Sequence, residues 1–127
     1  MPTTTGAARA IGLVLPHLAG KLEGLAMRVP VPSGSVTDLV AKVGSSVSVA
    51  AVNEAFRAAA ESGPLASVLE YREAPLVSSD IVGLPASCVF DADLTMVMSD
   101  TIKIAGWYDN EWGYSNRLVD LTTRVAG

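Results

Sequence analysis

The chain has 127 residues, of which 50% are hydrophobic and only 17% charged, and its formal net charge is −4. An acidic chain without runs of Lys or Arg is a poor match for nucleic acid or for an anionic membrane surface, so we expect neither partner. With one cysteine and one histidine, an internal disulfide framework is excluded, a metal site has almost no ligands, and a reducing cytoplasm is the simplest compartment.

The chain is apolar for its size, with a mean hydropathy of +0.38. No apolar run reaches the roughly 18 residues that a membrane span needs. A small domain has much surface to cover with polar groups. We therefore expect the chain to bury apolar faces against a partner subunit or another part of the same polypeptide, and to be poorly soluble when made alone.

Residues 5–19 are predicted to form a helix, because apolar residues recur at helical spacing between Thr5, a typical N-cap, and Gly20, a typical stop. Residues 25–32 alternate with a period of two, which indicates a strand, and the two prolines near its end are typical of an edge strand or a strand terminus. Residues 36–43 are a second strand-like run.

Ser48 is predicted to cap a second helix, which runs to about Ser62 and is ended by Gly63 and Pro64. Its inward-facing residues are expected to be Val52, Phe56, Ala59 and Ala60.

The second half of the chain is mostly extended. Short strands are predicted at residues 68–71, 88–90, 95–98 and 101–107. Ser99 and Asp100 indicate a hairpin turn, and a last helix is expected to begin near Asn110 or Glu111 and to end at about Val125. This order is not a regular βαβ alternation. It favours an α+β fold, with helices packed on one face of a largely antiparallel sheet.

Cys88 and His17 raise the possibility of a thiol nucleophile with a histidine base. The run Ser87 to Phe90 has the pattern of a strand interior, where a free cysteine behaves as a small apolar residue. His17 follows a proline at the end of a predicted helix. We therefore assign no catalytic residue to this chain.

Arg28 is a lone cation within an apolar strand pattern, where its guanidinium suits either an anionic ligand or a salt bridge to one of the 13 acidic residues. Thr5 and Gly6 open the first helix, whose N-terminus is suited to an anion, although Thr5 could serve only as a cap.

The stretch W-Y-D-N-E-W-G-Y at residues 107–114 holds both tryptophans and two of the three tyrosines. The aromatic residues are most simply core or interface groups. Asn110 is predicted to cap the last helix, and the same side chain offers a donor and an acceptor to an amide ligand.

Six motifs follow one another in a fixed order along the chain. They are T-T-T-G-A-A-R-A at 3–10, L-V-L-P-H-L-A-G-K-L-E-G at 13–24, M-R-V-P-V-P-S-G-S-V-T-D-L at 27–39, E-A-P-L-V-S-S-D at 73–80, F-D-A at 90–92 and W-Y-D-N-E-W-G-Y-S-N-R-L-V-D-L at 107–121. Together they resemble the C-terminal part of phosphorylating glyceraldehyde-3-phosphate dehydrogenase.

The resemblance implies a role for each matching residue. It places Thr5 and Gly6 at one phosphate site and Arg28 at the other, beside the substrate, while Asn110 and Tyr114 lie at the nicotinamide. It also implies NAD or NADP as cofactor, a phosphorylated aldehyde and inorganic phosphate as ligands, and a homotetramer in the cytoplasm. The reaction oxidises glyceraldehyde 3-phosphate to 1,3-bisphosphoglycerate in glycolysis.

Other parts of this family's pattern are not present. The sequence contains no S-C-T-T-N motif for the nucleophile and no G-x-G-x-x-G motif for a dinucleotide, and neither Cys88 nor His17 is the counterpart of the family's catalytic pair. Residues 1–127 are therefore expected to be a partial catalytic domain with its C-terminal helix, inactive alone. Two alternatives are an erythrose-4-phosphate dehydrogenase fragment, which Tyr108 matches less well, and a non-catalytic module that binds phosphorylated ligands or full-length subunits.

Overall fold

The computed structural model describes residues 1–127 of the chain and divides into two compact units. Unit 1 spans Met1–Val31 and unit 2 spans Pro32–Gly127. Each unit is described by itself below.

Unit 1 is a two-stranded ribbon with a helical connection. Strand β1 (Pro2–Thr4) pairs antiparallel with β2 (Leu25–Met27), and α1 (Ala7–Val14) and the short 3₁₀ helix η1 (Pro16–Leu18) lie between them in the sequence. The helix predicted over residues 5–19 is thus interrupted. Proline disfavours a helical conformation in the residue before it, and the backbone at Leu15 leaves the helical region (φ −121°, ψ 80°). Strand β1 was not predicted.

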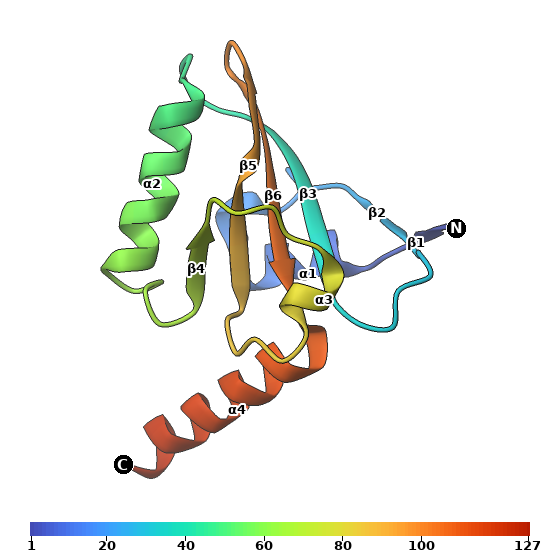
Figure 1. Cartoon of the computed structure of the whole chain (residues 1–127), viewed down its shortest axis with the longest axis vertical. Helices are drawn as coiled ribbons and strands as arrows, with labels where there is room; N and C mark the ends of the chain where they lie inside the picture. The colour runs from blue at the N-terminus through green and yellow to red at the C-terminus, as the bar shows by residue number, and fades with distance from the viewer. The chain divides into compact units, whose positions relative to one another are not determined.

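Unit 2 is built on a four-stranded sheet with the order β3-β6-β5-β4 (Figure 1). The strands are β3 (Ser35–Lys42), β4 (Leu69–Arg72), β5 (Cys88–Met98) and β6 (Thr101–Tyr108). Strands β3 and β5 both pair antiparallel with β6, whereas β4 and β5 are parallel. The largely antiparallel α+β fold is therefore confirmed.

The predicted hairpin turn is present between β5 and β6, and Ser99 adopts a positive φ of 60° there. Strand β5 is one continuous strand where two short strands were predicted. Its register with β6 shifts between Asp91 and Met96, and this irregularity lies between the two predicted pieces.

Helix α2 (Val49–Glu61) packs on β4 and β5, on one face of the sheet. Ser48 caps it as predicted, because its Oγ accepts a hydrogen bond from the Ala51 amide at 3.1 Å. Phe56 stacks on the buried Phe90 ring with centroids 4.0 Å apart, and Ala59 and Ala60 pack against the same cluster. The predicted inward face of this helix is confirmed.

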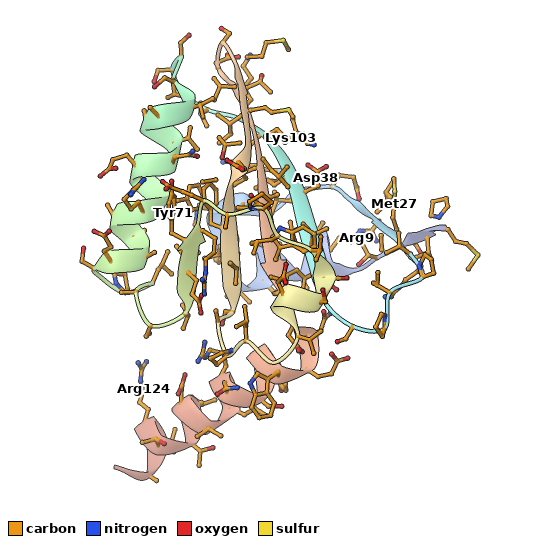
Figure 2. The ribbon with its side chains drawn as sticks, in the orientation of Figure 1. Arg9, Met27, Asp38, Tyr71, Lys103 and Arg124 are labelled. Atoms are coloured by element: carbon orange, nitrogen blue, oxygen red, sulfur yellow. The ribbon has the colours of Figure 1, made fainter.

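Along each strand, side chains point alternately toward α2 and toward the opposite face of the sheet. At one end, Val89 and Trp107 pack with Ile81 of the short helix α3 (Ser78–Ile81), which the sequence pattern did not indicate. Elsewhere on this face, Lys103 of β6 and Asp38 of β3 form an ion pair at 3.1 Å across the sheet (Figure 2).

Candidate functional site

The two residues predicted to bind one phosphate lie at the start of α1, in unit 1. The Thr5 hydroxyl accepts a hydrogen bond from the Ala7 amide at 3.2 Å, but the N-cap position belongs to Gly6, one residue later than predicted. An added Cβ at Gly6 would meet no atom of the chain within 4 Å. The space beside Gly6 is therefore open, and the first turn of α1 carries the positive end of the helix dipole.

Arg28 follows β2 at the other end of the same ribbon. Its backbone is tied to Met1 by two hydrogen bonds, of 2.9 Å from its amide and 2.7 Å to its carbonyl. Its exposed guanidinium takes part in none of the chain's ion pairs or hydrogen bonds. The salt-bridge interpretation of Arg28 is therefore not realised within this chain.

The register of the ribbon sets the spacing of these residues. Pro2 lies opposite Met27 and Thr4 opposite Leu25, so Thr5 and Arg28 are at opposite ends. At a strand rise of 3.3 Å per residue, their backbones are separated by roughly 13 Å. The backbones that carry these two groups therefore lie at opposite ends of the ribbon.

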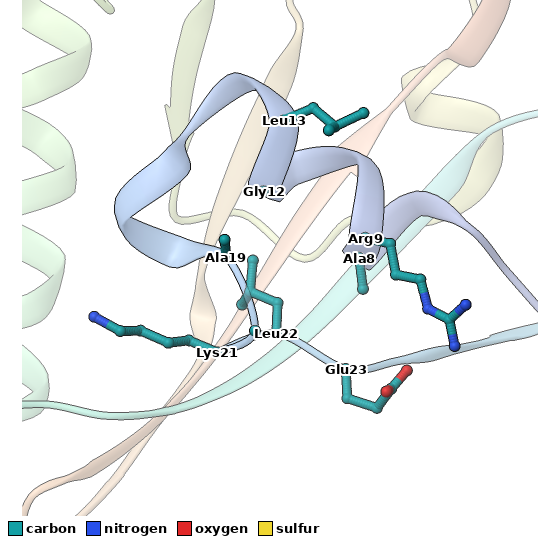
Figure 3. Close-up of a pocket in the computed structure, with 9 residues that line it drawn as sticks. Ala8, Arg9, Gly12, Leu13, Ala19, Lys21, Leu22 and Glu23 are labelled. Atoms are coloured by element: carbon teal, nitrogen blue, oxygen red, sulfur yellow. The ribbon is translucent and has the colours of Figure 1, made fainter.

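A surface hollow of about 420 Å³ lies on another side of α1 in unit 1 (Figure 3). Arg9 and Glu23 lie at one end of it and Lys21 at the other, and the lining between them includes the small residues Gly12 and Ala19. The lining thus carries two cations, Arg9 and Lys21, and one carboxylate, Glu23.

Asn110 and Tyr114 belong to α4 (Asn110–Ala126), in unit 2. The prediction that Asn110 caps this helix is wrong. The cap is Asp109, whose Oδ1 accepts a hydrogen bond from the Trp112 amide at 2.9 Å and whose Oδ2 accepts one from the Gly83 amide at 2.9 Å. Because Asp109 satisfies the helix terminus, the Asn110 side chain is available for another partner.

The carboxamide of Asn110 has one partner within the chain. Its Oδ1 accepts a hydrogen bond of 2.7 Å from the hydroxyl of Ser35, at the start of β3. Its amide nitrogen makes no hydrogen bond to the chain, so both of its donors are free. Tyr114 lies one turn further along α4, on the same side of the helix, and is 65% exposed.

The protonation of Asp109 reflects its two amide partners. The Gly83 amide and then the Trp112 amide lower the pKa of this carboxyl below its ordinary value, because both donate to the charged form. Burial, which leaves 6% of the residue exposed, opposes this shift, but the amide hydrogen bonds outweigh it and hold Asp109 as an anion at the N-terminus of α4.

Cys88 begins β5 and is half-buried. Burial raises the pKa of its thiol, which lowers the fraction of nucleophilic thiolate at neutral pH. His17 lies exposed in η1 of unit 1. No group of three or more His, Cys, Asp or Glu side chains is arranged to hold a metal ion, and no helix is long and apolar enough to cross a membrane.

Two residues of the site were missed by the sequence analysis. Asp109 had a detectable signal, because aspartate is as good an N-cap as asparagine and stands directly before it. Ser35 had none, because its partner Asn110 is 75 residues away and only the pairing of β3 with β6 brings them together.

The fold and these polar groups define the class of the protein: part of an α+β domain that presents an unpaired guanidinium, a helix N-terminus and a free side-chain amide. The chain belongs to the family described as glyceraldehyde 3-phosphate dehydrogenase, C-terminal domain, whose model matches residues 1–110.

Curated relatives support this assignment over nearly the whole chain. The chain is 62% identical over 126 residues to glyceraldehyde-3-phosphate dehydrogenase 2 of Streptomyces arenae, and 64% identical over 127 residues to the protein of that name from Streptomyces avermitilis. It is 60% identical over 126 residues to glyceraldehyde-3-phosphate dehydrogenase of Mycobacterium tuberculosis. In each case 99% of this chain is covered, but only 37% or 38% of the relative. The chain thus spans less than two fifths of these relatives.

Proposed function

We propose that this chain supplies the C-terminal part of the catalytic domain of a phosphorylating, NAD(P)-dependent glyceraldehyde-3-phosphate dehydrogenase. The rest of such an enzyme supplies the nucleophile and most of the cofactor site. The observation that carries the proposal is the identity of 60–64% over 99% of the chain to relatives that bear this name. The bound nicotinamide cofactor would accept hydride from the aldehyde carbon, and this chain would bind and orient the reactants.

The substrate phosphate and inorganic phosphate each need a cationic or amide-rich position, and unit 1 contains two such positions. The unpaired guanidinium of Arg28 presents a planar fork for the substrate phosphate. The open N-terminus of α1 at Thr5 and Gly6 suits inorganic phosphate. Their separation along the ribbon supports one phosphate group at each position.

The start of α4 is the part of the chain proposed to meet the cofactor. The free amide nitrogen of Asn110 can donate to the carbonyl oxygen of the nicotinamide carboxamide. Tyr114, one turn away, presents an exposed aromatic side chain beside it. Neither residue touches the reacting carbon in this proposal, so their role is to hold the ring in place.

Helix α4 also has an apolar surface that the chain leaves uncovered. Trp112 is 51% exposed, Val119 65% and Val125 80%, and Gly113 is the only buried residue of the helix. We assign this surface to contact with the remainder of the polypeptide or another subunit of a homotetramer in the cytoplasm.

The proposal can be tested with a chimera in which residues 1–127 replace the matching segment of the Streptomyces coelicolor relative, which is 62% identical over 127 residues. We expect the chimera to reduce NAD or NADP with glyceraldehyde 3-phosphate and inorganic phosphate. Arg28→Ala should raise the KM for glyceraldehyde 3-phosphate, whereas Arg9→Ala, a matched change of an exposed arginine, should not. A correctly assembled but inactive chimera would overturn the proposal.

Two further measurements separate the alternatives. A higher kcat/KM of the chimera for erythrose 4-phosphate than for glyceraldehyde 3-phosphate would favour the related dehydrogenase. The 127-residue chain alone should show no turnover. If it is monodisperse, melts cooperatively and binds phosphorylated ligands, the free-standing module is the better description.

A further inference from the structure

We propose that Ser35 is a positioning residue that sets the orientation of the Asn110 carboxamide for a nicotinamide. The inference rests on the function proposed above and adds a residue to it. Its basis is the hydrogen bond of 2.7 Å from the Ser35 hydroxyl to Asn110 Oδ1.

The fold places Ser35 against Asn110 through backbone pairing. Ser35 is the first residue of β3 and lies opposite Tyr108, the last residue of β6. Only the cap residue Asp109 separates Tyr108 from Asn110. A rigid sheet edge therefore delivers the hydroxyl to the first residue of α4, which is a more precise support than a mobile loop.

The hydrogen bond decides which end of the amide faces outward. The oxygen and nitrogen ends of a carboxamide have nearly the same shape, and rotation by about 180° exchanges an acceptor for donors. The observed separation of 2.7 Å is typical of O–H···O contacts and shorter than usual for N–H···O. With Ser35 donating to Oδ1, the nitrogen and its two donors remain for a ligand.

Asn110 can keep this orientation because a neighbouring residue caps the helix. Asp109 accepts from the Trp112 and Gly83 amides, so Asn110 is not needed as a cap. Without the Ser35 hydroxyl, Asn110 would be an exposed side chain with no fixed rotamer. A ligand would then have to order it, which weakens binding by roughly 3- to 10-fold for one side chain.

The contact itself can be measured in the assembled chimera from the side-chain ¹H–¹⁵N resonances of Asn110. They are expected to shift in Ser35→Ala and to return toward the original positions in Ser35→Thr, which keeps the hydroxyl. Resonances that do not move in Ser35→Ala would show that the hydrogen bond is absent and would overturn the proposal.

The role is tested by steady-state kinetics of the chimera. Ser35→Ala should raise the KM for the nicotinamide cofactor by about 3- to 10-fold, while kcat and the KM for glyceraldehyde 3-phosphate stay within about twofold. Ser35→Thr should restore the KM. Ser67→Ala, the same change at an exposed serine, should have no effect.

A double substitution separates positioning from a general structural effect. In an Asn110→Ala background, Ser35→Ala should cause no further rise in the cofactor KM. An equal rise in both backgrounds, or no rise in an active chimera, would overturn the role of Ser35 and leave the proposed function standing. An inactive chimera before any substitution would instead overturn the proposed function, and with it this role.

Discussion

The carboxylate of Asp109 accepts a hydrogen bond from the backbone amide of Gly83 at 2.9 Å, which joins the start of α4 to the turn that follows α3. Gly83 has a φ of +82°, in the left-handed region that favours glycine, and this turn aims its amide at the carboxylate. The second oxygen of Asp109 caps α4 through the Trp112 amide. One side chain thus fixes both the start of the helix and the segment beside it.

This arrangement predicts an acid-sensitive anchor for α4. The pKa of Asp109 is lowered by the Gly83 and Trp112 amides, so its contribution to stability is complete above the pKa of an unfolded aspartate. That contribution is lost as the pH falls through the depressed value. We expect Asp109→Asn to lower the melting temperature at pH 7 and to flatten its decline below pH 4, measured by circular dichroism. An unchanged acid profile would contradict this assignment.

The second prediction concerns the buried pair of Asp91 and Trp107. The indole Nε1 donates to Asp91 Oδ2 at 2.9 Å, and Asp91 is only 2% exposed. Its other oxygen, Oδ1, has no hydrogen-bond partner. Trp107→Phe should therefore lower the free energy of unfolding by about 3 kcal/mol, because it leaves a buried carboxylate without any partner.

The control for this pair keeps the phenylalanine and removes the charge. Adding Asp91→Asn to Trp107→Phe should recover part of the lost stability in urea denaturation, because an amide costs less to bury than a carboxylate. Equal stabilities for the single and double variants would show that the indole matters only through packing.

The third prediction concerns Gly106 in β6. A Cβ built at this position would lie 2.6 Å from Cys88 Sγ, which is closer than such atoms approach in proteins. Gly106→Ala should lower the free energy of unfolding by about 1–3 kcal/mol, since a packed site tolerates added volume poorly. In a Cys88→Ala background the same change should cost clearly less. The same loss of stability in both backgrounds would show that the strain does not come from contact with the Cys88 side chain.

The fourth prediction concerns the reactivity of Cys88. Burial raises the pKa of its thiol, so the thiolate is scarce near pH 7. We expect the folded chain to react with a disulfide reagent more slowly than a free thiol does, and to react readily once guanidinium unfolds it. In the chimera, Cys88→Ser should leave turnover intact. Loss of turnover would mean that this cysteine has the catalytic role that we did not assign to it.

The fifth prediction concerns exposed apolar residues of α4. Val119→Glu and Val125→Lys replace side chains that are 65% and 80% exposed, so they should remove little internal packing. We expect them to reduce self-association of the isolated chain in analytical ultracentrifugation. The same changes should impair assembly of the chimera. Normal assembly of the substituted chimera would show that this surface stays in solvent.

Local sequence signals were sufficient to predict the caps, stops and turns, whose positions depend on neighbouring residues. Ser48 predicts the cap of α2 because a serine hydroxyl at this position accepts a hydrogen bond from the amide three residues later, as the structure shows. The stop at Gly63 agrees with its φ of +87°, and the turn at Ser99 agrees with its positive φ. The long shared motifs were likewise sufficient to identify the family, and the match over residues 1–110 confirms that assignment.

Tertiary structure decided the features that depend on residues far apart. The pairing of β1 with β2 depends on a partner more than 20 residues away, and the pattern of a three-residue strand is too short to detect alone. The choice of Asp109 over Asn110 as the cap required the Gly83 amide, which is contributed by another segment. The orientation of Asn110 required Ser35, across 75 residues of sequence. The sequence by itself thus determined which polar and charged side chains the chain contains, because their chemistry is local. Only the packing of strands and turns decided which of them are occupied within the fold and which stay free for a ligand.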